Sequence, residues 1–290
     1  MERFLLQDLY HKTYDVLARG NFRFDARSDR VKNRKRKVVA NLSEEFGEKR
    51  VKALLKTMSN RYLLSHRSPE ITEHLQLVFS RGDKTVVLKV EHEPSRDYSH
   101  VYISTLDVPG LFSMIAGVMA ANGVNILGAQ IYTRSNGEAL DILQVRSTAG
   151  SIMNNPKKWQ KVEKDLNAVI EGRKLVSSLV AKRHKGLLAE RPMPRFANRV
   201  EIDNQVSDQY SVIDIYATDR VGLLYDIAHT LTDLGLYIGV SMISTKVDQV
   251  ADTFYVQDIF GQKVMVEEKI SEVKNALLTQ LSDEDTTDNK

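Results

Sequence analysis

The stretch "LDVPGLFSMIAGVMAANGVNILGAQIYT", residues 106–133, recurs later in the chain as "TDRVGLLYDIAHTLTDLGLYIGVSMIST", residues 218–245. A constant shift of 112 residues places Asp219 on Asp107. The same shift aligns further identical residues: Gly110 with Gly222, Leu111 with Leu223, Gly123 with Gly235 and Ile131 with Ile243. A gapless match of this length indicates an internal repeat, in which one structural unit is used twice.

Each copy has the pattern strand, strand, helix, strand, strand, helix. Extended segments at about 85–91 and about 197–203 begin the copies, and Ser135-Asn136-Gly137 is a hairpin signal in the first copy. Alternating strands leave one apolar face of a sheet for helices to cover. The sequence therefore predicts an α+β fold with an N-terminal helical segment and two ferredoxin-like ββαββα/βαββαβ units that have antiparallel sheets.

The domain boundaries follow from changes in pattern along the chain. An apolar stripe between Phe4 and Leu17 indicates a first helix, Ser43 is expected to start another, and Ser68 is expected to cap a third with Pro69 at its first position. A helical stretch from about 156 to 185, with a break near Gly172, and a proline-containing linker at 187–196 separate the two copies. We expect four parts: a helical arm over 1–80, a first unit over 81–190, a second unit over 191–282 and a disordered polar tail over 283–290.

Composition limits the function classes. The chain has 290 residues, of which 27% are charged and 42% hydrophobic, with a net charge of +3, as in an ordinary globular protein. It has no cysteine, which excludes disulfides and thiolate sites. Its N-terminus is charged and amphipathic, unlike a secretion signal, and the apolar stretch from Leu111 to Ala129 is interrupted by Asn122. We expect a cytoplasmic protein without a membrane segment.

The Asp-x-x-Gly-Leu loop has the chemistry to bind a small zwitterion. Asp107 ends a strand, Gly110 and Leu111 open a helix, and Pro109 suits the first turn. Free N–H groups at a helix start can bind a carboxylate, and Gly110 lets a ligand approach the backbone. Asp107 can accept an ammonium group, and the Asn125 amide can read a polar side chain. A free amino acid is the simplest ligand of this kind.

A purely structural alternative exists for the same residues. An Asp before a helix often serves only as an N-cap, and a Gly there often serves only a tight turn. In the second copy Tyr237 replaces Asn125 and Val221 replaces Pro109, so two identical sites are not expected. The candidate ligand-binding residues are Asp107, Pro109, Gly110, Leu111, Asn125, Ile126, Asp219, Gly222 and Leu223.

The two repeated stretches resemble ACT domains, regulatory modules that bind amino acids at domain interfaces. The segments "LLQDLYHKTYDVLARG" and "NRYLLSHRSPEITEH", followed by two ACT-like units, are similar to the C-terminal part of the bifunctional uridylyltransferase/uridylyl-removing enzyme. The resemblance covers nearly the whole chain. It implies an ACT-type fold, glutamine as the ligand, the missing catalytic domains of the same enzyme as a partner, and control over modification of the PII signalling protein.

The catalytic residues of that family are not found in this sequence. Its transferase domain needs a Gly-Ser turn followed by paired aspartates that hold magnesium, and the one Asp-x-Asp here is Asp283 to Asp285 in the polar tail. The uridylyl-removing half needs an adjacent His-Asp pair, and none of the seven histidines is followed by Asp. We therefore expect a catalytically inert chain with no cofactor or metal, because magnesium would belong to the missing domains.

Two other functions remain as alternatives. The ACT-like units can serve as a ligand-free interaction or oligomerisation module. The basic run from Arg27 to Lys37 can contact nucleic acid, but it lacks interleaved aromatic residues, so a solvated helix or a docking surface for the catalytic half is favoured. His66 and His74 are expected to be surface or capping residues, and Trp159 to be a packing anchor.

Overall fold

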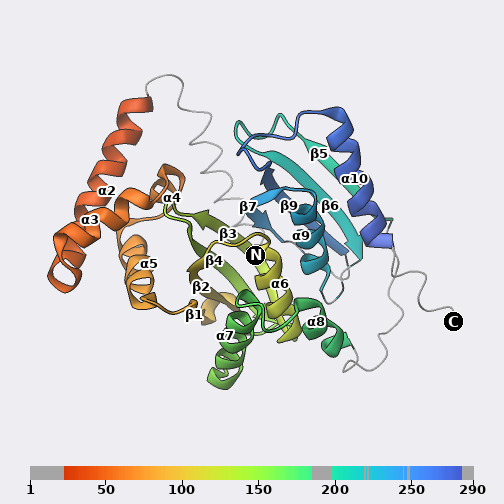
Figure 1. Cartoon of the computed structure of the whole chain (residues 1–290), viewed down its shortest axis with the longest axis horizontal. Coiled ribbons are helices and arrows are strands. Elements are labelled where there is room, and N and C mark those ends of the chain that lie inside the picture. The colour runs from red at the N-terminus through yellow and green to blue at the C-terminus, as the bar shows by residue number, and fades with distance from the viewer. Residues whose placement is uncertain are drawn as a thin grey trace. The chain divides into compact units, whose positions relative to one another are not determined.

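The computed structural model describes residues 23–184, 197–218, 220, 222–243, 245–246 and 249–282 (Figure 1). Contacts divide the chain into one unit that ends at Gln76 and a second that begins at Leu77. The predicted helix between Phe4 and Leu17, the linker at 187–196 and the tail at 283–290 lie outside the described residues.

The first unit is helical, as the sequence predicted. Its helices are α2 (Arg23–Phe46), α3 (Glu48–Thr57), α4 (Asn60–Ser65) and the start of α5 (Ser68–Arg81). Their apolar sides form a core that includes Val38, Leu42, Val51, Leu55, Tyr62, Leu63, Ile71 and Leu75. The basic run lies within α2 as part of one continuous helix, so the strongly charged side of this helix is left to solvent.

Two predicted helix starts in this unit were wrong. Ser43 lies inside α2, where its hydroxyl donates to the Val39 carbonyl at 2.5 Å, and the next helix has Gly47 as its N-cap. Ser68 is the first residue of α5 rather than its cap, which moves Pro69 to the second helical position. The Glu70 carboxylate instead accepts the Arg67 backbone N–H at 2.7 Å. Local side-chain bonds of this kind can satisfy Ser within a helix as well as at its end.

His66 and His74 are buried rather than exposed at the surface, and His66 is also a capping residue, because it is the C-cap of α4. Their exposed fractions are 7% and 4%, and their ring centroids lie 5.0 Å apart. The Tyr62 hydroxyl lies 2.9 Å from Nδ1 of His74. Among the described residues no group of three or more His, Asp or Glu side chains is arranged to hold a metal ion. The two histidines therefore belong to the core of the first unit.

The second unit contains two successive ββαββα copies, which confirms the predicted fold. The first copy consists of β1 (Val86–Glu93), β2 (Tyr98–Leu106), α6 (Leu111–Ala121), β3 (Val124–Thr133), β4 (Glu138–Ser147), α7 (Pro156–Ile170) and α8 (Val176–His184). The second consists of β5 (Arg199–Asp203), β6 (Ser211–Thr218), α9 (Leu223–Asp233), β7 (Tyr237–Met242), β8 (Thr245–Lys246), β9 (Gln249–Gln257) and α10 (Glu267–Ser282). Every pairing between these strands is antiparallel.

The two copies share one continuous sheet, in the order β1-β2-β4-β3-β7-β9-β6-β5, with β8 paired to β9 outside this path. The two halves join where β3 pairs with β7, as Figure 1 shows near the centre of the sheet. Helices α6 to α10 and one face of the sheet contribute to a single apolar core, with Ile103, Ile115, Met119, Ile213, Ile227 and Phe254 among its buried members. The two copies therefore fold as one body.

Several local predictions in the first copy are confirmed. The β3–β4 turn closes with the Arg134 N–H donating to the Glu138 carbonyl at 2.7 Å. The long helical stretch is broken between α7 and α8, where Gly172 has a φ of 71°. Trp159 is buried and its indole N–H donates to the Met153 carbonyl at 2.8 Å, as expected of a packing anchor.

Candidate ligand-binding site

Asp107 is fixed against the β3–β4 turn and does not cap the helix that follows. Its backbone N–H donates to the Gly137 carbonyl at 3.0 Å, and its carboxylate accepts the Thr133 hydroxyl at 2.6 Å. The N-cap of α6 is Gly110, which has no side-chain cap. The structural alternative, in which Asp107 serves as an N-cap, is therefore excluded, and a half-exposed carboxylate stands beside the helix start.

The start of α6 has unpaired backbone amides. Gly110 adopts a left-handed conformation with φ 74° and ψ 14°, which favours glycine. The Leu111 N–H donates to the Val108 carbonyl, but the N–H groups of Phe112 and Ser113 have no hydrogen-bond partner among the described residues. Pro109 precedes the cap and is exposed, so its predicted place in the first turn was wrong. Such free amides, at the positive end of a helix, favour an anion.

The first loop lies against the second copy. A Cβ on Gly110 would meet the Thr232 methyl group at 3.3 Å, and one on Gly117 would meet the Tyr225 ring at 2.9 Å. These two contacts show that α6 and α9 run antiparallel, with the start of α6 next to the end of α9. Because residues later in α6 lie next to residues earlier in α9, Gly222, at the start of α9, lies opposite the end of α6. Each loop therefore faces the other copy of the repeat.

Asn125 does not join Asp107 in one site. It pairs with Arg146 near the beginning of β3, whereas Thr133, which bonds to Asp107, ends that strand. Eight residues of strand separate Asn125 from Thr133, or about 25 Å. The antiparallel pairing of β3 with β7, from Gly128 with Met242 to Gln130 with Val240, instead directs the start of β7 at Tyr237 toward the Thr133 end of β3. Tyr237, which replaces Asn125 in the repeat, is thus on the side of the first loop.

The second loop has the same backbone form as the first. Gly222 is the left-handed N-cap of α9, with φ 84° and ψ −5°, and it has no side-chain cap. Asp219 lies outside the described residues. Arg220 forms an ion pair with Asp226 at 2.5 Å in the first turn of α9, a feature that the first loop lacks. The two loops therefore differ chemically, in line with the expectation that they are not identical sites.

Three of the predicted site residues are part of the core. Leu111, Leu223 and Ile126 have exposed fractions of 4%, 3% and 5%, and all three pack in the helix-covered core. Any ligand at the loops therefore contacts their backbone rather than their side chains. Ile126, like Asn125, lies at the end of α6 that faces the second loop.

Asp141 is a buried carboxyl beside the first loop that the sequence did not single out. It lies in the middle of β4, between Ile103 of β2 and Ile131 of β3, and is fully buried. Neither carboxyl oxygen is in hydrogen-bond geometry with a partner among the described residues. Burial, followed by the nearby charge of Asp107, raises its pKa to about 8, although the Tyr132 backbone amide lowers it slightly. Asp107 therefore has a protonated acid as its neighbour at neutral pH.

A signal for Asp141 was present in the sequence. It stands in a run of successive buried residues of β4, where a charged residue is costly, and the repeat places Asp252 at the equivalent position. Asp252 is also buried, with an exposed fraction of 2%. The presence of an Asp at the same position of both buried strands was therefore a stronger sequence signal for an unusual position than the turn residues alone.

The comparisons with known proteins agree with this architecture. Residues 199–284, the second copy, match the family described as "ACR9-like, ACT-like domain". The chain is 35% identical over 276 residues to the bifunctional uridylyltransferase/uridylyl-removing enzyme of Rhodospirillum rubrum, which covers 94% of this chain. It is 30% identical over 282 residues to that of Azospirillum brasilense, with 96% of this chain covered. The chain is a homologue of a segment of these enzymes.

The homology extends over nearly all of this chain but only part of its relatives. The chain spans 29–30% of the length of the two bifunctional uridylyltransferase/uridylyl-removing enzymes. A solved aspartate kinase from Synechocystis is 14% identical and superposes with a TM-score of 0.33, covering 62% of this chain and 26% of the kinase. A score of this size does not establish a common fold. Among the described residues, every helix is too short or too polar to cross a bilayer.

Proposed function

We propose that this chain is the amino-acid-sensing part of a uridylyltransferase/uridylyl-removing enzyme. In this proposal glutamine is the ligand, and its binding controls how catalytic domains act on the PII signalling protein. The homology to these enzymes and the ACT-like second copy support the assignment to a regulatory segment. Glutamine and PII come from the family resemblance of the sequence.

One observation carries the sensing proposal: two uncapped helix starts face the boundary between the ACT-like copies. At the first, the free amides of Phe112 and Ser113 offer donors to a carboxylate, and Asp107 offers an acceptor to an ammonium group. A free amino acid carries both groups. Because the loop residues belong to one copy and Thr232 and Tyr237 to the other, a bound ligand would hold the two copies in one arrangement.

Sensing requires that the ligand bind two arrangements of the protein with different affinity, since equal affinity shifts nothing. The boundary between the copies can supply this difference. It rests on three residue pairs between β3 and β7 and on the packing of α6 against α9. A small change in the angle between the copies would alter both loop sites at once.

A ligand-free interaction module is the second candidate. The continuous sheet favours it, because pairing of the two copies already satisfies the inner strand edges without a ligand. The two candidates differ in their response to free amino acids. In a thermal unfolding assay, sensing predicts that millimolar glutamine raises the melting temperature more than glutamate, asparagine or glycine does. An unchanged melting temperature with all of these amino acids would favour the interaction module.

A further inference from the structure

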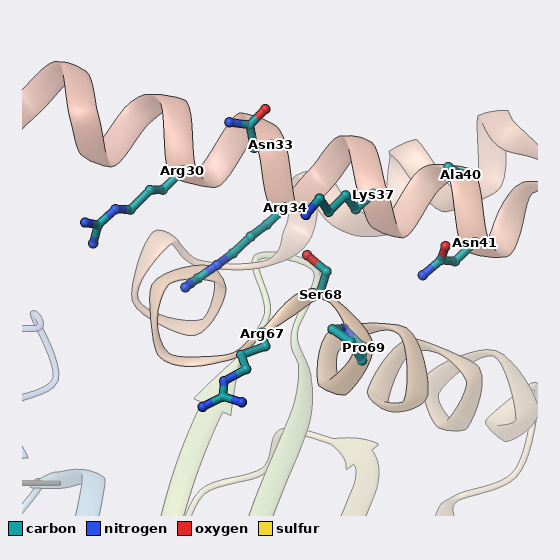
Figure 2. Close-up of a pocket in the computed structure, with 9 residues that line it drawn as sticks. All are labelled: Arg30, Asn33, Arg34, Lys37, Ala40, Asn41, Arg67, Ser68 and Pro69. Carbon is teal, nitrogen blue, oxygen red and sulfur yellow. The ribbon is translucent and has the colours of Figure 1, made fainter. Parts of the chain in front are cut away.

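A groove on the first unit gathers four cationic side chains. It lies between α2 and the turn that leads into α5, and its volume is about 550 Å³. Arg30, Arg34 and Lys37 follow one another at spacings of four and three residues, so they share one face of α2. Figure 2 shows these side chains extending from α2 on the side of the turn that carries Arg67.

The described residues balance the positive charge of this groove only in part. Arg30, Lys37 and Arg67 have no ion-pair partner among them, and Arg34 donates to the Leu63 carbonyl. Burial and the positive charge of Arg30 lower the pKa of Arg34, while Glu70 opposes this shift. Arg30 and Arg34 are thus close enough to repel each other.

Glu70 is the carboxylate beside the groove, and it is already engaged. It accepts the Arg67 backbone N–H at 2.7 Å and lies 3.7 Å from Nδ1 of His66, and its polar contact with His66 is the main cause that lowers its pKa to about 2. Glu70 is therefore ionised at neutral pH. Its negative charge offsets one of the four positive charges of the groove, which leaves a net positive charge. This carboxylate already bonds one of the backbone N–H groups at the start of α5. An anion in the groove would therefore be bound mainly by the cationic side chains.

We propose that this groove binds a polyphosphate anion, such as inorganic triphosphate or the phosphate chain of a nucleotide. Guanidinium groups match phosphate oxygens in a two-bond geometry, and a lysine adds a point charge. The volume has room for several phosphoryl groups. No aromatic residue is among those that line the groove, so it lacks a surface on which a base could stack. The ligand is therefore recognised by its charge and its phosphate spacing.

The test uses the 290-residue chain and tripolyphosphate as the probe, titrated by calorimetry at low and moderate salt. The variant Arg30→Gln/Arg67→Gln removes two groove cations. Its matched control, Lys32→Gln/Lys52→Gln, removes two exposed cations of the first unit that do not line the groove and that pair with Asp29 and Glu48 instead. We expect binding that weakens with salt, a loss of at least about tenfold in the groove variant, and a change of less than about twofold in the control.

Two further arms define the ligand class. ATP and UTP should bind about as tightly as tripolyphosphate, because the base is not read. Lys37→Glu, with a melting curve like that of the parent chain, should weaken binding by a similar factor and so guards against misfolding of the double variant. No binding at millimolar tripolyphosphate, or equal weakening in the control, would overturn the proposal. Single-stranded RNA that binds at least tenfold more tightly than tripolyphosphate would replace it with a nucleic-acid surface.

Discussion

Ala129 of β3 and Ser241 of β7 pair across the boundary between the two copies, and they are equivalent residues of the repeat. The flanking pairs, Gly128 with Met242 and Gln130 with Val240, exchange under the same shift of 112 residues. A pseudo-two-fold axis therefore passes between Ala129 and Ser241, as in an isologous dimer interface built within one chain. Each loop then faces the other copy of the repeat.

The helix contact at this boundary should tolerate no added methyl group at Gly117. A Cβ there would lie 2.1 Å from the Val176 side chain and 2.9 Å from Tyr225. Alanine gains about 1 kcal/mol of helix propensity, but overpacking costs about 1–3 kcal/mol. We expect Gly117→Ala to lower the free energy of unfolding, measured by urea denaturation. In the control Gly128→Ala the nearest atoms would be 3.8 Å away, so equal stabilities of the two variants would contradict this packing.

Asp141 should make stability depend on pH. Its pKa is raised to about 8 in the folded state, above the unfolded value of about 4. Between these values the folded chain holds a proton that the unfolded chain has lost, so this group lowers stability by about 1.4 kcal/mol per pH unit as pH rises. Asp141→Asn should remove that slope. Between pH 5 and pH 7.5 the free energy of unfolding of Asp141→Asn should therefore rise increasingly above that of the parent chain. Parallel curves for the two proteins would contradict the raised pKa of Asp141.

Asp165 should act in the opposite direction. Burial alone would raise its pKa, but bonds from Lys161 at 2.8 Å, Lys174 at 2.7 Å and Asn122 at 3.2 Å lower it to about 2. Its contribution is present above about pH 4 and is lost as pH falls toward 2. Asp165→Asn should cost about 1–3 kcal/mol at pH 7 and much less near pH 2.

The matched control for Asp165 is Asp233→Asn. Asp233 also faces a basic side chain on its own helix, with His229 at 2.8 Å, but the Asp233 side chain is 64% exposed. An exposed pair of this kind contributes about 0.2–1 kcal/mol at most. If Asp233→Asn and Asp165→Asn lowered the free energy of unfolding equally, the buried network around Asp165 would contribute no more stability than an exposed pair.

The shared loop site predicts which substitutions act together. Asp107 and Tyr237 should contribute to one site, because the antiparallel pairing of β3 with β7 directs Tyr237 toward the end of β3 where Thr133 bonds to Asp107. Asn125 lies at the far end of β3 and should act independently of Asp107. In a double-mutant cycle on amino-acid affinity, Asp107→Asn and Tyr237→Ala should couple by more than about 0.5 kcal/mol. Asp107→Asn and Asn125→Ala should be additive, and the reverse pattern would place each site within one copy.

The sequence predicted the elements that local patterns determine. Alternating apolar residues identified the strands, and the repeat gave their order in both copies, because side-chain periodicity reflects which face of a strand is buried. The break near Gly172 and the anchoring of Trp159 followed from local chemistry in the same way.

The arrangement between the copies could not be read from such patterns. Pairing of β3 with β7 depends on contacts between residues more than a hundred positions apart, so Asn125 was assigned to the wrong partner loop. The predicted helix start failed at Ser43 because a hydroxyl can bond within a helix as well as cap it. It failed at Ser68 because the Glu70 carboxylate accepts the Arg67 backbone N–H, so that Ser68 is already the first helical residue. The burial of His66 and His74 likewise depends on packing between helices.

The most direct test of the central claim is a calorimetric titration of glutamine into this chain and into Asp107→Asn. If the uncapped start of α6 and the Asp107 carboxylate bind an amino acid, the parent chain should release or absorb heat with saturation. The variant should then bind at least about tenfold more weakly, since a charge-assisted bond contributes about 1.5–3 kcal/mol. Absence of saturable heat at millimolar glutamine, or equal affinity in the two proteins, would contradict the account.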